Sequence, residues 1–258
     1  MKKEMKFTVI VRILTGLCIW LGITKGYAHF ISPYLAEKIP EVWQMILSAM
    51  LVPYAVALPV FYLLVRKMDV VKLKENADKK EMSKAMMAQA LVIQSGLSFI
   101  VMFVVNFLSI AMGSAPAGVT AQQIGSHWLF YIIMLLVFNP IVEELFFRKL
   151  ILERLRVLGT RQAILVSAIF FALPHVISQG IAQMFYTFVL GLVWGTVTIK
   201  SGKLLPAILL HAFSNLYGAF LPLLLTQTVP GTVVFMVIWV ILMPTAATIL
   251  LIRWVRKK

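Results

Sequence analysis

Acidic residues are scarce in this chain, which has only ten Asp and Glu among 258 residues, against 24 Lys and Arg. Charged residues of both signs make up 13% of the sequence, and 61% of it is hydrophobic. So few charges cannot cover the surface of a soluble domain of this length, whereas a lipid bilayer removes the need for that cover. The composition therefore excludes an ordinary soluble protein and predicts a polytopic membrane protein.

Cysteine is also nearly absent, because Cys18 is the only one in the chain. A single cysteine excludes an intrachain disulfide and a CxxC metal site. Cys18 lies inside the first apolar run, where we interpret it as a small hydrophobic residue packed among helices.

The formal net charge of +14 does not indicate a nucleic-acid partner. The basic residues form no patch interleaved with aromatic residues, which is the usual sign of a nucleic-acid interface. They cluster between the hydrophobic runs instead, as Lys and Arg do when they are retained on the cytoplasmic side of a membrane. We therefore expect the lipid bilayer, and no nucleic acid, as the partner of this charge.

Hydrophobic windows of about 20 residues, the length that crosses a bilayer as a helix, recur along the whole chain. They predict an all-α protein with about eight transmembrane helices, at 7–25, 42–65, 86–112, 127–149, 163–178, 181–199, 205–226 and 231–252.

The connecting segments alternate between basic and nearly uncharged, so 21 of the 24 basic residues fall on one side of the predicted membrane. This distribution predicts that both termini are cytoplasmic. The basic start and apolar middle of the first 22 residues also fit a signal peptide. We reject that alternative because no A-x-A-like site follows and cleavage would spoil the alternation.

The polar segment from Arg66 to Lys84 is the expected boundary between two parts of the chain. Residues 1–85 are interpreted as accessory transmembrane helices and a cytoplasmic linker. Residues 86–258 are interpreted as the core transmembrane bundle, which contains every candidate site residue described below.

Glu143 and Glu144 stand at the end of an apolar run long enough to cross a bilayer. Ionisable groups at membrane depth cost several kcal/mol, on the order of 2.5–3.5 by lenient scales, so an adjacent pair indicates a functional site. Residues four apart share a helix face, which predicts that Arg148 neutralises Glu144. Glu143 points about 100° away from Glu144 and would face a cavity shared with other helices.

Two of the four histidines lie inside apolar runs, each four positions from another notable residue. Phe171 shares a helix face with His175, and His211 shares one with Asn215. Alone, each would be interpreted as a packing residue that holds helices together by hydrogen bonds. Together with Glu143, they predict three helices that converge on one polar catalytic cavity open to the cytoplasmic side.

These residues also carry a family resemblance. The segment from Glu143 to Arg148 resembles an EExxxR motif, Phe171 to His175 resembles FxxxH, and His211 to Asn215 resembles HxxxN. Their order resembles that of the CPBP family, which comprises type II CAAX prenyl endopeptidases and bacteriocin-processing enzymes and is also labelled Abi. The resemblance covers about 130–225.

The resemblance implies an intramembrane endopeptidase of a bacterial cell membrane, sometimes described as a metalloprotease, that cleaves a membrane-associated or lipidated peptide or protein. Glu143, assisted by His175, would activate a water molecule, and His211 and Asn215 would donate hydrogen bonds to the oxyanion. Glu144, Arg148 and Phe171 would support them. We prefer no obligatory metal; the alternative is a zinc ion held by Glu143, His175 and His211.

The predicted spans place the site residues at different depths in the membrane, although they are expected to meet. At about 1.5 Å per residue, Glu143 and His211 lie roughly 9 Å from the cytoplasmic edge and His175 roughly 18 Å. The fifth span must therefore start later than residue 163, tilt, or break at Pro174.

Two other functions remain open at this point. Buried carboxylates and histidines also form the proton relays of proton-coupled transporters. A transporter would show symmetry between its halves and polar residues through both leaflets, and the sequence shows neither. The second alternative is a catalytically silent membrane regulator or immunity protein, against which the intact set of polar residues argues.

Overall fold

The computed structural model describes residues 3–73, 82–112 and 121–256, and every regular element within those ranges is a helix. Within those ranges, eight helical stretches are long and apolar enough to cross a membrane, which confirms the all-α polytopic fold. They are Lys6–Leu35, Glu41–Val65, Lys84–Ala111, Trp128–Leu158, Thr160–Ile177, Ile181–Ser201, Leu205–Leu225 and Val229–Arg253.

The spans differ from the prediction mainly at their ends. The first helical stretch continues to Leu35 rather than ending at 25, and the fourth continues to Leu158 rather than 149. A helix satisfies its own backbone hydrogen bonds in lipid and in the interface alike, so it need not stop where the apolar run stops. Arg148 lies well inside this longer helical stretch, as the predicted span 127–149 already placed it.

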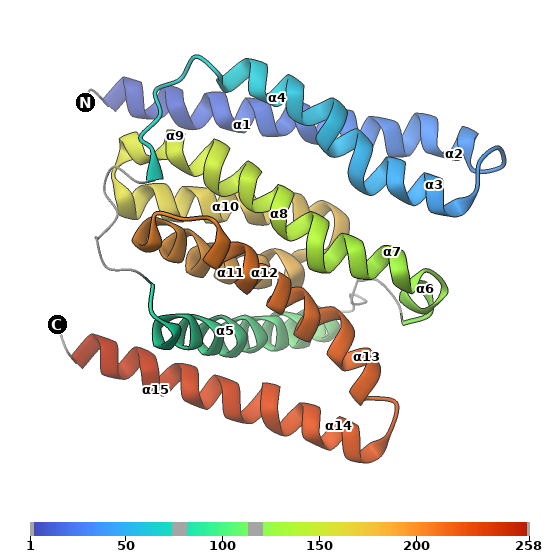
Figure 1. Ribbon diagram of the computed structural model, residues 1–258, viewed down its shortest axis with the longest axis vertical. Helices are drawn as coiled ribbons and strands as arrows, with labels where there is room; N and C mark the ends of the chain where they lie inside the picture. The colour runs from blue at the N-terminus through green and yellow to red at the C-terminus, as the bar shows by residue number, and fades with distance from the viewer. Residues whose placement is uncertain (1–2, 74–81, 113–120, 257–258) are drawn as a thin grey trace. The chain divides into compact units, whose positions relative to one another are not determined.

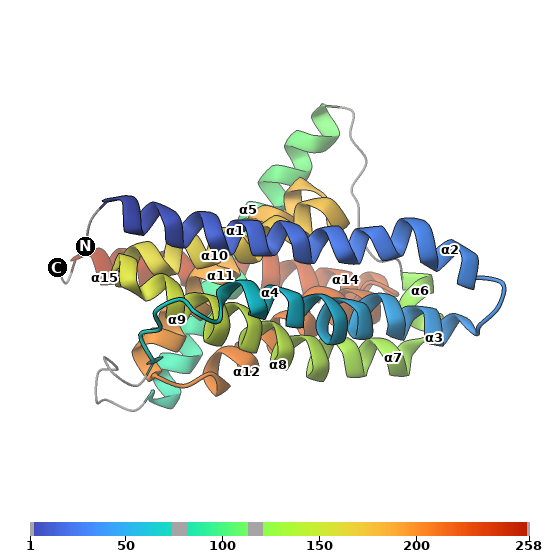
Figure 2. The ribbon, with the colours of Figure 1, turned by 90° about the horizontal axis from the view of Figure 1, so that it is seen from above.

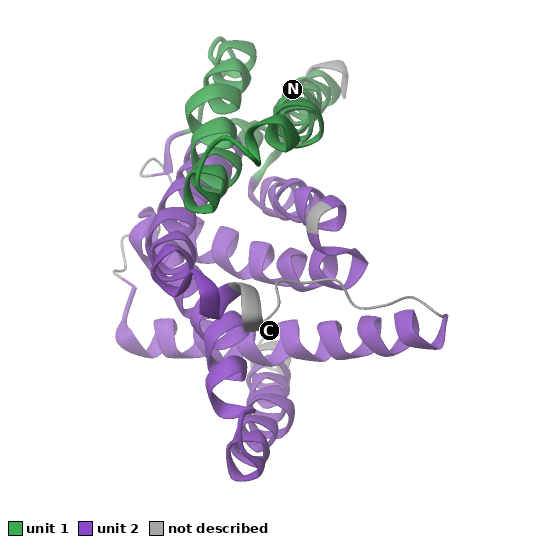
Figure 3. Cartoon of the chain, turned by 90° about the vertical axis from the view of Figure 1, so that its right-hand side faces the viewer, with its two compact units in different colours: residues 1–71, 154–159 green, residues 72–153, 160–258 purple. Residues whose placement is uncertain are grey.

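The chain divides into two compact units, drawn in different colours in Figure 3. The first comprises residues 1–71 and 154–159, and the second comprises residues 72–153 and 160–258. The predicted separation of an accessory part from a core at residue 85 is a statement about function and stays a prediction. Residues 74–81 of the expected linker lie outside the described residues.

The first unit is built on a helical hairpin, visible in Figures 1 and 2. The first arm packs along the second, where Phe61 is fully buried against Gly16 and Trp20 donates its indole N–H to the carbonyl of Pro53 at 2.7 Å. The elements are α1 (Lys3–Gly26), a π-helical turn (Tyr27–Ile31), α2 (Ser32–Leu35), α3 (Glu41–Ile46), a π-helical segment (Leu47–Ala57) and α4 (Leu58–Val65).

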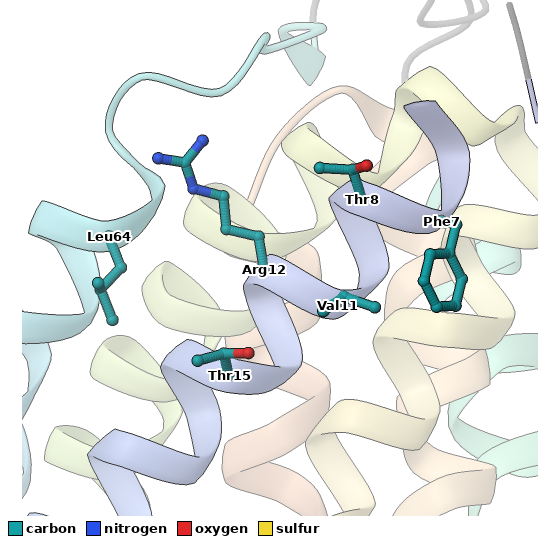
Figure 4. A pocket seen from close by; sticks show the side chains of 6 residues that line it. All are labelled: Phe7, Thr8, Val11, Arg12, Thr15 and Leu64. Carbon is teal, nitrogen blue, oxygen red and sulfur yellow. The ribbon is translucent and has the colours of Figure 1, made fainter. Parts of the chain in front are cut away.

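A pocket of about 430 Å³ lies on this hairpin, between α1 and the end of α4 (Figure 4). Its lining residues are Phe7, Thr8, Val11, Arg12, Thr15 and Leu64. Arg12 is the only ionisable residue among them, so the pocket offers no acid and base pair for hydrolysis. The predicted site residues all lie in the second unit.

The second unit contains the remaining six spans. Its principal elements are α5 (Lys84–Ala111), α6 (Ala121–Ser126), α7 (Trp128–Ile132), a π-helical turn (Ile133–Phe138), α8 (Asn139–Glu144), a π-helical segment (Leu145–Leu152), α10 (Thr160–Gln179), α11 (Ile181–Ser201), α12 (Leu205–Asn215), a π-helical turn (Leu216–Phe220), α13 (Leu221–Leu225), α14 (Val229–Met236), a π-helical turn (Val237–Leu242) and α15 (Met243–Arg256). The fourth span ends with the short α9 (Glu153–Leu155) and a 3₁₀ turn (Arg156–Leu158), whose residues 154–158 belong to the first unit.

Helix α11 is the most buried of the eight spans and packs against α5, α10 and α12 (Figure 1). Gly191 allows α10 to approach closely, because a Cβ built there would lie 3.0 Å from the Cα of Ala168. The helix ends at Gly202, whose φ of 63° is the left-handed conformation that favours glycine. Helix α11 is therefore held in place by its neighbours, and its side chains face the interior of the second unit.

Candidate active site

The two acidic residues of the fourth span occupy different environments. Glu144 is fully buried, and its Oε2 accepts a hydrogen bond from Nε of Arg148, also fully buried, at 2.9 Å. Glu143 keeps 13% of its side chain exposed. The ion pair predicted from the four-residue spacing is thus present, and it leaves Glu143 as the accessible carboxylate.

Arg148 is held from several sides. Its Nη1 donates to Oγ of Ser167 on α10 at 3.2 Å, and its guanidinium carbon lies 5.0 Å from the centre of the Phe171 ring. A guanidinium over an aromatic face is stabilised by the ring quadrupole. Arg148 therefore ties α10 to the segment that carries both glutamates.

His211, on α12, reaches both glutamates. Its Nδ1 lies 3.2 Å from Oε1 of Glu144, and its Nε2 lies 4.0 Å from Oε2 of Glu143. A carboxylate paired with arginine can only accept hydrogen bonds, so Nδ1 carries the proton that Glu144 accepts. Nε2 is then the ring nitrogen that faces Glu143.

His175, on α10, is oriented by its own helix. Its Nδ1 lies 3.0 Å from the carbonyl oxygen of Phe171, one turn earlier, and a carbonyl can only accept. Nδ1 therefore donates, which leaves Nε2 of His175 as an acceptor. Helix α10 runs through Pro174 and begins at Thr160, so neither a break nor a later start places His175. No tilt is needed either, because the fourth span continues to Leu158: Glu143 lies 15 residues before that end, and His175 lies 15 residues after the start of the fifth span at Thr160.

Phe171 brings the two imidazoles together. Its ring centre lies 5.2 Å from that of His175 and 6.1 Å from that of His211, so one aromatic ring contacts both. The spacing of four residues predicted the contact between Phe171 and His175. The contact with His211 joins α10 to α12 and was not predictable from spacing within one helix.

Asn215 is in the same region but already has a partner. Its Nδ2 donates to the carbonyl oxygen of Leu135, in the fourth span, at 2.7 Å. The amide has a second N–H, so one donor is left for another acceptor. The bond also ties α12 to the span that carries Glu143.

Two residues of the site were not expected from the sequence. The Trp194 ring stacks on the His211 ring, with centres 4.2 Å apart and planes 20° apart. The Trp194 indole N–H donates to Oε1 of Gln94 at 2.7 Å, and the Gln94 amide donates to the carbonyl oxygen of Leu210 at 2.9 Å. A glutamine inside the apolar third span was the available signal, although no spacing connected it to the histidines.

The side chains are more enclosed than an open cavity would require. His211 is 4% exposed, and Glu144, Arg148 and Gln94 are fully buried. The polar cavity open to the cytoplasm stays a prediction. The observed arrangement is a compact polar cluster with Glu143 at its accessible edge.

The cluster does not fit a three-ligand metal site. Within residues 3–73, 82–112 and 121–256, no three His, Cys, Asp or Glu side chains are placed to hold one ion. The alternative set of Glu143, His175 and His211 is therefore not arranged as zinc ligands in this structure.

Fold and site together define a class of protein: an integral multi-pass membrane protein with an acid, imidazole and amide cluster buried among its helices. Residues 124–217 match the family model described as type II CAAX prenyl endopeptidase Rce1-like. This match supports, over that segment, the resemblance carried by the three motifs. The matched segment includes the motif residues from Glu143 to Asn215 and excludes Gln94. A search of curated proteins and a search of solved structures found no match.

Proposed function

We propose that the protein is an intramembrane endopeptidase that hydrolyses a peptide bond of a membrane-associated peptide or protein with a water molecule activated by Glu143. The observation that carries the proposal is the convergence of Glu143, Glu144 and His211 within hydrogen-bonding and ion-pairing distance in a domain of a protease family. Burying ionisable groups in a membrane costs free energy, so their presence there indicates a function.

In the proposed reaction, Glu143 takes one proton from water while the water oxygen bonds to the scissile carbonyl carbon. The Nε2 of His175, free of intrahelical bonding, accepts the second water O–H and orients the water. Asn139, one turn before Glu143, has an Oδ1 that is buried with no hydrogen-bond partner in the described part of the chain. An unsatisfied acceptor near the base supports a bound water at this place.

The carbonyl oxygen becomes an oxyanion, which Nε2 of His211 and the second N–H of Asn215 stabilise. Because Nδ1 of His211 already donates to Glu144, donation from Nε2 requires the doubly protonated ring. With that ring, Glu143, Glu144, Arg148 and His211 sum to zero charge. The carbon–nitrogen bond then breaks, and Glu143 gives its proton to the leaving amine. One such base contributes about 10²–10⁴ in rate, and one oxyanion donor about 10²–10³.

The test uses purified full-length protein in lipid nanodiscs with three peptide sets: prenylated peptides with a C-terminal CAAX sequence, the same peptides without lipid, and apolar leader peptides. In ¹⁸O-labelled water, hydrolysis should place one ¹⁸O in the new carboxylate of the product, read by mass spectrometry. The peptide set that is cleaved would identify the substrate class.

Glu143→Gln is the matched variant, since the amide keeps the size of the side chain but cannot take a proton. We expect its cleavage rate to fall about 10²–10⁴-fold while expression and melting temperature stay near those of the parent. Cleavage by this variant at the parent rate would show that the assigned base is wrong. If the parent cleaves none of the three sets, the regulator hypothesis is favoured instead.

A further inference from the structure

We infer that Gln94 and Trp194 are positioning residues that set the orientation of the His211 ring. The inference rests on the proposed function for its catalytic consequence, and it concerns a residue, Gln94, outside the segment that matches the protease family.

Gln94 is a fully buried amide in a transmembrane helix, and both ends of its side chain are bonded to other helices. Its Oε1 accepts from the indole of Trp194 on α11 at 2.7 Å, and its Nε2 donates to the carbonyl oxygen of Leu210 on α12 at 2.9 Å. Leu210 directly precedes His211. One side chain therefore holds both the ring that covers His211 and the backbone that carries it.

Trp194 fixes the plane of the imidazole. It is 1% exposed, and its ring lies nearly parallel to that of His211, with centres 4.2 Å apart. The bond from Nδ1 to Glu144 holds only one point of the imidazole, about which the ring could still tilt. A large aromatic face at stacking distance resists that tilt.

Three restraints thus meet at His211: Gln94 on the backbone, Trp194 on the ring plane and Glu144 on Nδ1. Together they determine where Nε2 points, which is towards Glu143 at 4.0 Å. Catalytic groups must be held closely, since a misplacement of about 1 Å can cost on the order of 100-fold in rate.

The alternative is that Gln94 only holds helices together, as a buried glutamine between transmembrane helices often does. The two interpretations differ in their consequences. Joining helices affects stability alone, whereas positioning affects the environment of the His211 ring and the turnover number.

The experiment compares three variants of the full-length protein in nanodiscs. Gln94→Met removes both hydrogen bonds at similar volume, and Trp194→Phe keeps an aromatic face but loses the N–H donor. Ser98→Ala is the control: Ser98 is fully buried one turn along α5, and its hydroxyl donates to the carbonyl oxygen of Ser95 at 3.4 Å and also faces Tyr186 and Tyr217, which are not among the partners of Gln94.

The first measurement is the NMR signal of histidine rings, with His211 identified by the loss of its signal in His211→Ala. The stacked indole shifts the ring protons of His211 through its ring current, so Gln94→Met and Trp194→Phe should move those signals while Ser98→Ala leaves them in place. Unchanged His211 signals in Gln94→Met would overturn the inference. This readout needs no activity, so it decides the matter even if the parent cleaves no peptide.

The second measurement is cleavage of whichever peptide the parent hydrolyses. We expect Gln94→Met to lower kcat about 10- to 100-fold with KM within about twofold, and Ser98→Ala to keep the parent rate. A loss of activity that only follows the loss of folded protein, with His211 signals unchanged, would assign Gln94 to helix packing and contradict the inference.

Discussion

At the residue scale, the pair of Glu144 and Arg148 shows how a membrane protein retains charge in its interior. Both side chains are fully buried, and each has further polar partners: His211 for the acid and Ser167 for the base. Removing one partner from such a pair leaves an uncompensated charge, which costs far more than the pair contributes.

We therefore expect Arg148→Ala to lower the free energy of unfolding by about 3–5 kcal/mol, because Glu144 would keep only His211. The measurement is thermal denaturation in detergent. The control is Lys149→Ala, since Lys149 is 52% exposed and its ion pair with Glu153, at 2.7 Å, lies partly in solvent. That variant should lose no more than about 1 kcal/mol. An unchanged melting temperature in Arg148→Ala would count against the structural importance of the pair.

The same residues show what the sequence could predict about the site. Two contacts follow from a spacing of four residues, because helix geometry alone brings such residues together. They are the contact of Glu144 with Arg148 and that of Phe171 with His175. The contacts of His211 with Glu144, and of Gln94 with Trp194, join residues 67 and 100 positions apart. They depend on how helices pack, which no spacing within one helix encodes.

At the scale of elements, close approach of helices depends on where glycine stands. Helix α5 packs against α15 at Gly96, where an added Cβ would lie 2.4 Å from the backbone oxygen of Met243 and 2.5 Å from Cβ of Ala247. A backbone atom cannot give way as a flexible side chain can. The two helices would have to separate.

Gly96→Ala should therefore destabilise the protein by about 1–3 kcal/mol, the usual cost of overpacking. Gly22→Ala is the matched control, because it adds the same methyl group within α1, where nothing lies within 4 Å. Alanine at that position should be neutral or stabilising, since it reduces the freedom of the unfolded chain. Melting temperatures of the two variants in the same detergent make the comparison; equal values would contradict the packing seen at α5 and α15.

The helical spans were also predictable at this scale, since the length and apolar character of each run determine them. Their ends were less so. The first span stays helical through His29 and Pro33 to Leu35. A helix makes its backbone hydrogen bonds internally, so polar residues at the membrane surface do not end it. Apolar composition locates a helix in lipid but does not say where the helix stops.

At the scale of the whole molecule, the described residues contain eight candidate spans, and an even number of crossings predicts that both termini lie on the same side of the membrane. The excess of Lys and Arg predicts that this side is the cytoplasm. The orientation also bears on substrate access. His211 lies six residues after the start of the seventh span at Leu205, or about 9 Å from the end that adjoins Lys203. We therefore predict that a substrate reaches the proposed site from the side on which Lys203 lies.

Labelling of single cysteines in cells tests this orientation. Cys18 is first replaced by serine, which leaves no other cysteine in the chain. Cysteine is then introduced one position at a time, as Lys38→Cys, Lys203→Cys and Gln227→Cys, at exposed residues between predicted spans. A maleimide that does not cross membranes should label intact cells at positions 38 and 227, and should label position 203 only after permeabilisation. Labelling of Lys203→Cys in intact cells, with protection of Gln227→Cys, would invert the topology and place the site within reach of substrates outside the cell.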